Sequence, residues 1–98
     1  MQARVARYEV PPDRCDEAVD AFTSAGSEIA ALDGFHSGYL LVDAETGAVV
    51  TCTFWDDEAS LEAAATRAAT ARREAVGAVE GDVLSVQTFD VVRDLAAS

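Results

Sequence analysis

The chain has 98 residues, with 18 acidic and 7 basic side chains and a formal net charge of −11. Nucleic acids and anionic membrane surfaces would repel such a charge, so neither is expected as a partner. No apolar run approaches the roughly 20 residues that span a bilayer, and the N-terminal segment lacks the apolar region of a signal peptide. We therefore expect a cytoplasmic protein with one domain over residues 1–98 and a core over about residues 3–92.

The chain opens with an alternating strand and continues into a helix. Residues 3–10 alternate in polarity with a period of two, which predicts a strand. The Pro11–Pro12 pair ends it, because proline cannot donate to a ladder. Asp13 is the expected N-cap of a helix that runs to about Leu32. One face of this helix is apolar at steps of three and four residues and is expected to be buried: Cys15, Val19, Phe22, Gly26, Ile29 and Leu32.

Three glycines mark special positions in this half of the chain. Gly26 lies inside the predicted helix, where it indicates a close approach of the sheet or a ligand, or else a tolerated imperfection. Gly34 offers a left-handed end to the helix, and Gly47 supplies a positive φ in a hairpin loop. This loop joins two strands, expected at residues 35–42 and 48–55, which should pair antiparallel.

A second helix follows the third strand and leads to a fourth. Asp56 or Asp57 is the expected N-cap, and the helix continues to about Val76 or Val79. A strand is expected at residues 83–92. The inner face of the helix is thin and rich in alanine: Leu61, Ala64, Ala65, Ala68, Ala75 and Val79.

The resulting order, βαββαβ, predicts an α+β fold with a four-stranded antiparallel sheet, of the ferredoxin-like type. Right-handed crossovers place both helices on one face of that sheet. The third strand carries large apolar side chains on both of its faces, so the face opposite the helices also needs a cover. A second copy of the chain is the simplest cover, and we expect a homodimer.

Neither the cysteines nor the histidine indicates a metal or cofactor site. Cys15 and Cys52 form no CxxC pair and no cluster with histidine, so we interpret both as small apolar side chains. His36, the single histidine, lacks a carboxylate or nucleophile partner, and an exposed or rim position is expected for it. No phosphate-binding loop, dinucleotide fingerprint or nucleophile elbow is present.

The best candidate for a binding site is the end of the third strand. Trp55 is the single tryptophan, and it either fills the core between strand and helix or forms one wall of a pocket for a planar ligand. Thr51 and Thr53 share its row, and their hydroxyls suit a mostly apolar pocket, although threonine also simply favours strands. Arg73 either stabilises a ligand anion or pairs with a nearby acid such as Glu80.

The stretch "GFHSGYLLVDAETGAVVTCTFWDDEASLEAA" resembles the antibiotic-biosynthesis-monooxygenase-like domains. The shared pattern is a Gly-Phe pair entering the second strand, an acidic and glycine-containing hairpin, and a third strand that ends in tryptophan before an acidic helix cap. The resemblance extends over about residues 3–92. It implies a homodimeric α/β barrel in which two ferredoxin-like sheets face each other.

The resemblance also implies an activity and a set of site residues. Some members are cofactor-free oxygenases of polyketide quinone precursors, and Trp55 and Arg73 fall on their pocket tryptophan and helix arginine. Their strand asparagine, helix tyrosine and strand histidine are replaced here by Thr51, Leu61 and Leu41. The haem-degrading branch needs a strand-one asparagine, a helix tryptophan and a histidine ligand, which this chain lacks, so no haem is expected.

We therefore predict a cofactor-independent monooxygenase-like protein that binds or oxidises a small planar phenolic or quinonoid compound. The alternative is a non-catalytic dimeric binding or accessory module on the same scaffold. An open cavity beneath Trp55 with Arg73 pointing inward would favour the enzyme, and a filled space would favour the module. The residues expected at the site are Trp55, Arg73 and Thr51 as catalytic groups, and Phe22, Tyr39, Thr53, Phe54 and Leu61 as substrate contacts.

Overall fold

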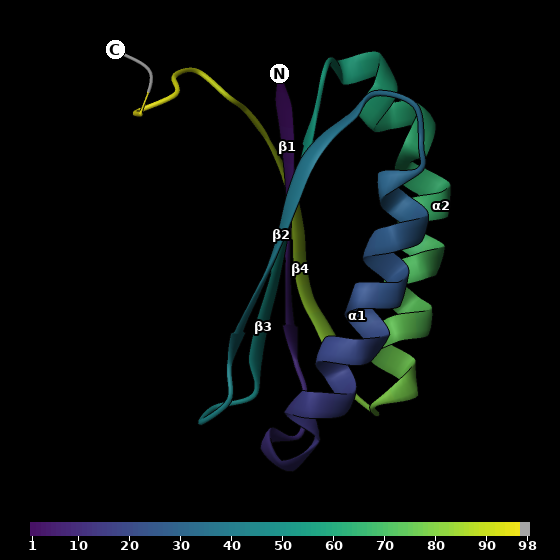
Figure 1. Cartoon of the computed structure of the whole chain (residues 1–98), viewed down its shortest axis with the longest axis vertical. Coiled ribbons are helices and arrows are strands. Elements are labelled where there is room, and N and C mark those ends of the chain that lie inside the picture. The colour runs from purple at the N-terminus through teal and green to yellow at the C-terminus, as the bar shows by residue number, and fades with distance from the viewer. Residues whose placement is uncertain (97–98) are drawn as a thin grey trace.

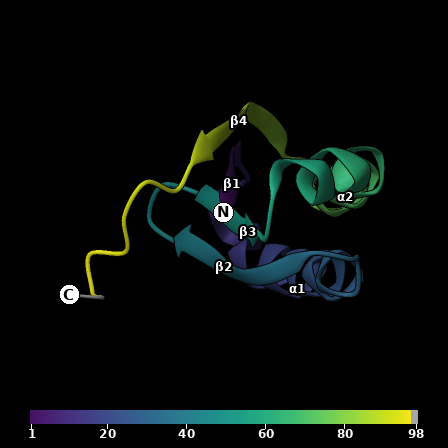
Figure 2. The same cartoon turned by 90° about the horizontal axis from the view of Figure 1, so that it is seen from above.

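Strands and helices follow one another along the chain in the predicted βαββαβ order. In the computed structural model, which describes residues 1–96, both helices lie side by side on one face of the sheet (Figures 1 and 2). The predicted α+β ferredoxin-like architecture is thereby confirmed. The elements are β1 (Gln2–Glu9), the 3₁₀ turn η1 (Pro12–Arg14), α1 (Cys15–Ala30), β2 (Phe35–Asp43), β3 (Ala48–Trp55), α2 (Glu58–Ala78) and β4 (Asp82–Asp90).

The four strands form one sheet in the order β2-β3-β1-β4, and every neighbouring pair is antiparallel. The central position of β1 places Val5 between Cys52 of β3 and Gln87 of β4. No helix of the described residues covers the second face of the sheet. Residues 91–96 run away from the helices on that open side (Figures 1 and 2).

The start of α1 differs from the prediction. Asp13 lies inside η1, where the amide of Arg14 donates to the carbonyl of Pro11 at 2.9 Å. Proline fits the first positions of such a turn, so the proline pair starts a 3₁₀ turn and delays the helix to Cys15. The N-cap of α1 is Arg14, which makes no side-chain capping hydrogen bond.

The N-cap of α2 and the glycine turns on either side of β2 have the predicted local structure. Asp57 caps α2 by accepting a hydrogen bond from the backbone amide of Ser60 at 2.7 Å, which lowers the pKa of its carboxyl. Gly34 and Gly47 both have the expected positive φ. At Gly47 any side chain would collide with the carbonyl oxygen of Val10, so this position requires glycine.

The core lies between the helices and the inner face of the sheet. β1 and β3 contribute the largest fully buried side chains, which include Tyr8 and Trp55. On α1 the buried stripe is displaced from the prediction, because Ala18 and Ala25 are buried while Val19 is 38% exposed. The buried face of α2 is rich in alanine, as predicted: Leu61, Ala64, Ala68, Ala71, Ala75 and Val76.

Candidate cavity between the first helix and the sheet

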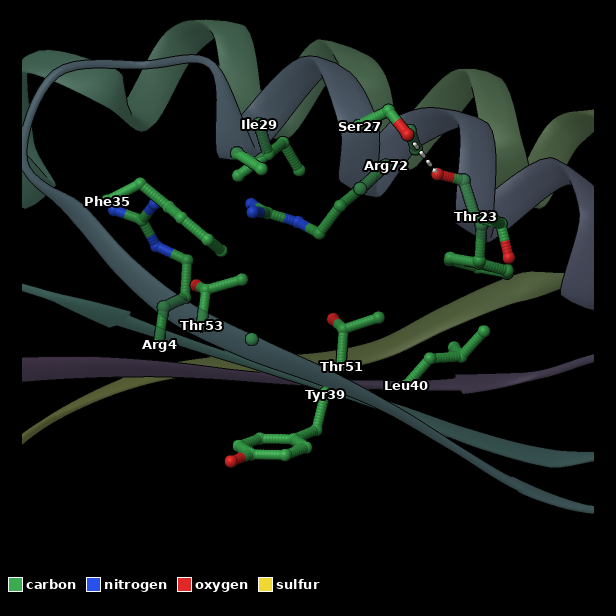
Figure 3. A pocket seen from close by; sticks show the side chains of 15 residues that line it. Arg4, Thr23, Ser27, Ile29, Phe35, Tyr39, Leu40, Thr51, Thr53 and Arg72 are labelled. Carbon is green, nitrogen blue, oxygen red and sulfur yellow. Dashed lines mark hydrogen bonds between the residues drawn. The ribbon is translucent and has the colours of Figure 1, made fainter.

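A cavity of about 400 Å³ lies between α1 and the sheet (Figure 3). α1 forms one wall, strands β2 and β3 form the opposite wall, and single residues from β1 and α2 complete it. Its volume lies within the range of about 300–1,000 Å³ that is usual for small-molecule sites. The large apolar side chains in the lining are Phe22, Ile29, Phe35 and Leu40.

Small side chains on both walls keep this space open. Gly26 lines it from α1, Gly38 lines it from β2, and Thr51 and Thr53 line it from β3. A Cβ atom added at Gly26 would meet no atom within 4 Å. Of the interpretations open for Gly26, close approach of the sheet is therefore wrong. The glycine enlarges the cavity instead.

The two threonines of β3 are held by residues of the core. The hydroxyls of Thr51 and Tyr8 lie 3.1 Å apart in a hydrogen bond. Thr53 accepts a hydrogen bond of 3.0 Å from the indole Nε1 of Trp55. Both cavity hydroxyls are thus fixed from behind, which limits the directions in which they can meet a ligand.

Trp55 lies behind the cavity wall and is absent from the lining. Its side chain is 0% exposed, and its ring meets that of Phe35 edge-on at a centroid distance of 5.5 Å. Trp55 instead contacts two residues of the cavity wall, Phe35 and Thr53, which both belong to the lining. Of the two interpretations left open for Trp55, the geometry agrees with the core residue.

Two arginines reach the cavity, and neither was among the predicted site residues. Arg4 comes from β1 and Arg72 from α2, and their guanidinium groups point toward the same part of the cavity (Figure 3). Burial lowers the pKa of Arg4, and the nearby charge of Arg72 adds to this effect. Burial is also the main cause that lowers the pKa of Arg72. Period-two alternation would have found Arg4, since it shares the buried row of Ala6 and Tyr8.

Arg73, the predicted charge stabiliser, lies outside the cavity. Its side chain is exposed on α2, and the preceding residue, Arg72, occupies the position expected for it. One residue turns a helix by about 100°, so two adjacent arginines face different directions. The expectation that Arg73 points into the cavity is therefore corrected to Arg72.

The remaining predicted contacts divide between the cavity and other places. Phe22 lines the cavity, and its ring centroid lies 4.7 Å from that of Tyr8. Tyr39 belongs to the lining, but its ring lies on the other side of the sheet (Figure 3). There its centroid is 6.3 Å from that of the Phe54 ring. Phe54 and Leu61 do not line the cavity: Phe54 belongs to the outer row of β3, and Leu61 is buried in the core.

The lining offers no side chain suited to hold a metal ion. It contains no histidine, cysteine, aspartate or glutamate, and no group of three such residues in the described part of the chain is placed to bind a metal. His36 is exposed, with Nδ1 3.2 Å from the hydroxyl of Ser37, and both cysteines are free thiols.

No helix of the described residues is long and apolar enough to cross a membrane.

Comparison with known proteins decides the family. A family model described as antibiotic biosynthesis monooxygenase matches residues 1–81. The chain belongs to the antibiotic biosynthesis monooxygenase family. The predicted resemblance is therefore confirmed as family membership. No curated protein matches the chain.

Solved structures with this family fold superpose over nearly the whole chain. SnoaB, described as a cofactor-independent oxygenase from Streptomyces nogalater, matches with a TM-score of 0.72 at 22% identity, over 96% of this chain and 95% of SnoaB. A conserved protein from Methanosarcina mazei Go1 matches with 0.71 at 15% identity, over 90% and 89%. A mutant of MhuD with two manganese protoporphyrin IX molecules per active site matches with 0.72 at 22% identity, over 97% and 98%. At these identities the likeness shows a shared fold.

Proposed function

We propose that this member of the antibiotic biosynthesis monooxygenase family is a cofactor-independent monooxygenase that binds and oxidises a small planar phenolic or quinonoid compound. The observation that carries the proposal is the cavity between α1 and the sheet. It combines apolar walls with the hydroxyls of Thr51 and Thr53 and the guanidinium of Arg72. Apolar walls with a few fixed polar groups are typical of sites for small aromatic ligands.

In the proposed reaction an ionised, electron-rich ring reacts directly with oxygen. Arg72 stabilises the ring anion, because a cation in a desolvated site favours the charged form of a neighbouring acid. For an anthrone-like substrate, a ring CH₂ becomes a carbonyl. One oxygen atom of O₂ forms that carbonyl, and the other leaves as water with both hydrogens of the CH₂. Trp55 acts as a positioning residue through its hydrogen bond to Thr53.

We also propose that the protein is a homodimer in which two sheets face each other. The face of the sheet without helices carries apolar side chains from several strands. Tyr39 and Leu41 of β2 are 64% and 52% exposed, Phe54 of β3 lies beside Tyr39, and Phe89 of β4 shares the face with Phe54 because both pair with Ala3. Val92 and Leu95, which follow β4 on the same open side, are also exposed. A second copy would remove this surface from water. We propose a cytoplasmic location as well, and the free thiols of Cys15 and Cys52 agree with it.

The cavity can be filled without disturbing the core, which provides a test. In Gly26→Leu the new side chain enters the open space, whereas Gly77→Leu adds the same group to α2 where no atom lies within 4 Å and outside the lining. We expect Gly26→Leu to abolish quenching of Trp55 fluorescence and oxygen uptake with anthrone-like phenols and naphthoquinols. Gly77→Leu should retain both. Equal responses from the two variants would place the site elsewhere.

A non-catalytic binding module is the second candidate, and one observation favours it. The lining has no aspartate, glutamate or histidine that could act as a general base at neutral pH. Oxygen uptake separates the two candidates. Saturable binding with no oxygen consumed by any bound phenol or quinol would establish the module and exclude the monooxygenase.

A further inference from the structure

Arg4 carries a buried charge that its surroundings leave partly unpaired. The residue is 6% exposed, and its Nη2 donates to the carbonyl oxygen of Leu61 at 3.2 Å. Its Nη1 is buried and has no hydrogen-bond partner among the described residues. A buried cationic donor without an acceptor is costly, and such groups are rare unless a ligand or ion completes them.

A second cation faces the same space, and no acidic side chain in residues 1–96 forms an ion pair with either of them. Arg72 lines the cavity with Arg4, and the lining contains no acidic residue. Acidic side chains pair instead with Arg14, through Glu17 and Glu80. This local excess of positive charge contrasts with a chain whose net charge is −11.

We propose that the cavity recognises an aromatic ligand through an anionic oxygen group, a carboxylate or an ionised phenol, held between Arg4 and Arg72. The anion supplies the acceptor that Arg4 Nη1 lacks, and planar guanidinium groups bind such oxygens with strong charge-assisted hydrogen bonds. The ring lies along the apolar walls formed by Phe22, Ile29 and Leu40. This inference rests on the proposed function for the ring, and it adds the charged group that selects the ligand.

Two matched pairs of probes test the anionic group. The first pair is 2-naphthoate and its methyl ester, and the second is 2,4-dinitro-1-naphthol, which is ionised at neutral pH, and its methyl ether. Calorimetric titration of the wild-type protein should show at least one anion binding roughly tenfold or more tightly than its neutral partner. The pair that shows this preference distinguishes a carboxylate from a phenolate. No preference in either pair would overturn the inference.

Variants then assign the preference to the two arginines. In Arg4→Met and Arg72→Met we expect the preference for the anion to fall to roughly threefold or less. The control, Arg73→Met, removes the same charge from the exposed side of α2 and should keep the preference. Arg72 is only partly buried, so Arg72→Met remains informative if Arg4→Met does not fold. A preference that survives in Arg72→Met and in any folded Arg4→Met would contradict the inference.

Failure of this inference can be distinguished from failure of the proposed function. If the anion preference is present but no phenol or quinol drives oxygen uptake, the anion site stands and the monooxygenase does not. If neutral phenols are oxidised with no anion preference, the reverse holds. If no probe of either pair binds, the anion site is excluded, and oxygen uptake with anthrone-like phenols and naphthoquinols decides the monooxygenase separately.

Discussion

The indole Nε1 of Trp55 donates a hydrogen bond to Oγ1 of Thr53 at 3.0 Å, so a residue of the core orients a residue of the cavity. The two side chains are neighbours in the inner row of β3, and Phe35 contacts the same indole ring. The tryptophan therefore influences the site from behind the wall. A change at Trp55 should affect both the stability of the fold and the geometry of the cavity.

Trp55→Phe is expected to lower the free energy of unfolding by about 1–3 kcal/mol, because the core loses aromatic surface and Thr53 loses its donor. Urea denaturation measures this loss. Thr53→Val is the companion variant, since it keeps the indole but leaves a buried N–H unpaired, and it should also destabilise the fold. If Trp55→Phe unfolds at the wild-type urea concentration, the packing described for Trp55 is wrong.

Tyr8→Phe should change how stability depends on alkaline pH. Burial raises the pKa of the Tyr8 phenol, so the folded state holds this proton more tightly than the unfolded chain does. The associated stabilisation is complete below the unfolded pKa of about 10 and is lost as the pH rises through the folded pKa. The variant should therefore lose stability less steeply above about pH 10.

At neutral pH the same variant loses the hydrogen bond to Thr51, at an expected cost of about 0.5–1.5 kcal/mol. Urea denaturation at a series of pH values measures both effects. Thr51→Val is the control, because it removes the hydrogen bond but keeps the buried Tyr8 phenol, so its stability should still fall steeply at alkaline pH. An identical alkaline profile for Tyr8→Phe and wild type would rule out this role for Tyr8.

Asp57→Ala should destabilise the start of α2, because the amide of Ser60 loses its acceptor. Asp56→Ala provides a matched control, since Asp57 is the N-cap and its neighbour is not. The pKa of Asp57 is lowered in the fold, so its contribution is present above the unfolded pKa of about 3.9 and is lost as the pH falls through the folded pKa. Thermal unfolding at neutral and acidic pH should show a difference between the two variants that shrinks in acid.

Leu41→Glu should convert the proposed dimer into monomers. Leu41 is 52% exposed on the face of the sheet without helices, where a buried charge from each copy would oppose association. Val19→Glu is the control, because Val19 is an exposed apolar residue of α1, and α1 lies on the other face of the sheet (Figure 2). Sedimentation velocity would show a dimer for the control. A wild-type protein that sediments as a monomer at high micromolar concentration would refute the proposed assembly.

Local rules were sufficient to determine the order of elements from the sequence. The alternation over residues 3–10, the apolar run over residues 48–55 and the proline pair after β1 can be recognised from neighbouring residues alone. Gly34 and Gly47 mark the turns in the same way, because glycine adopts a positive φ readily. The acidic cap of α2 was also predicted, although the choice between Asp56 and Asp57 required the structure. The shift of α1 to Cys15 depended on how the prolines shape the preceding turn.

The cavity was decided by tertiary structure. Whether Arg72 or Arg73 faces inward depends on the rotation of α2 about its own axis, which its alanine-rich face constrains only weakly. Phe54 and Tyr39 were expected at the site, but their rows are assigned to one face only once the helices are placed. The open space beside Gly26 lies between α1 and the two threonines of β3, Thr51 and Thr53. These segments are far apart in the chain, so only the tertiary structure brings them together. The sequence by itself determined the elements and the family resemblance, because these follow from local periodicity, and packing between elements determined which side chains surround the cavity.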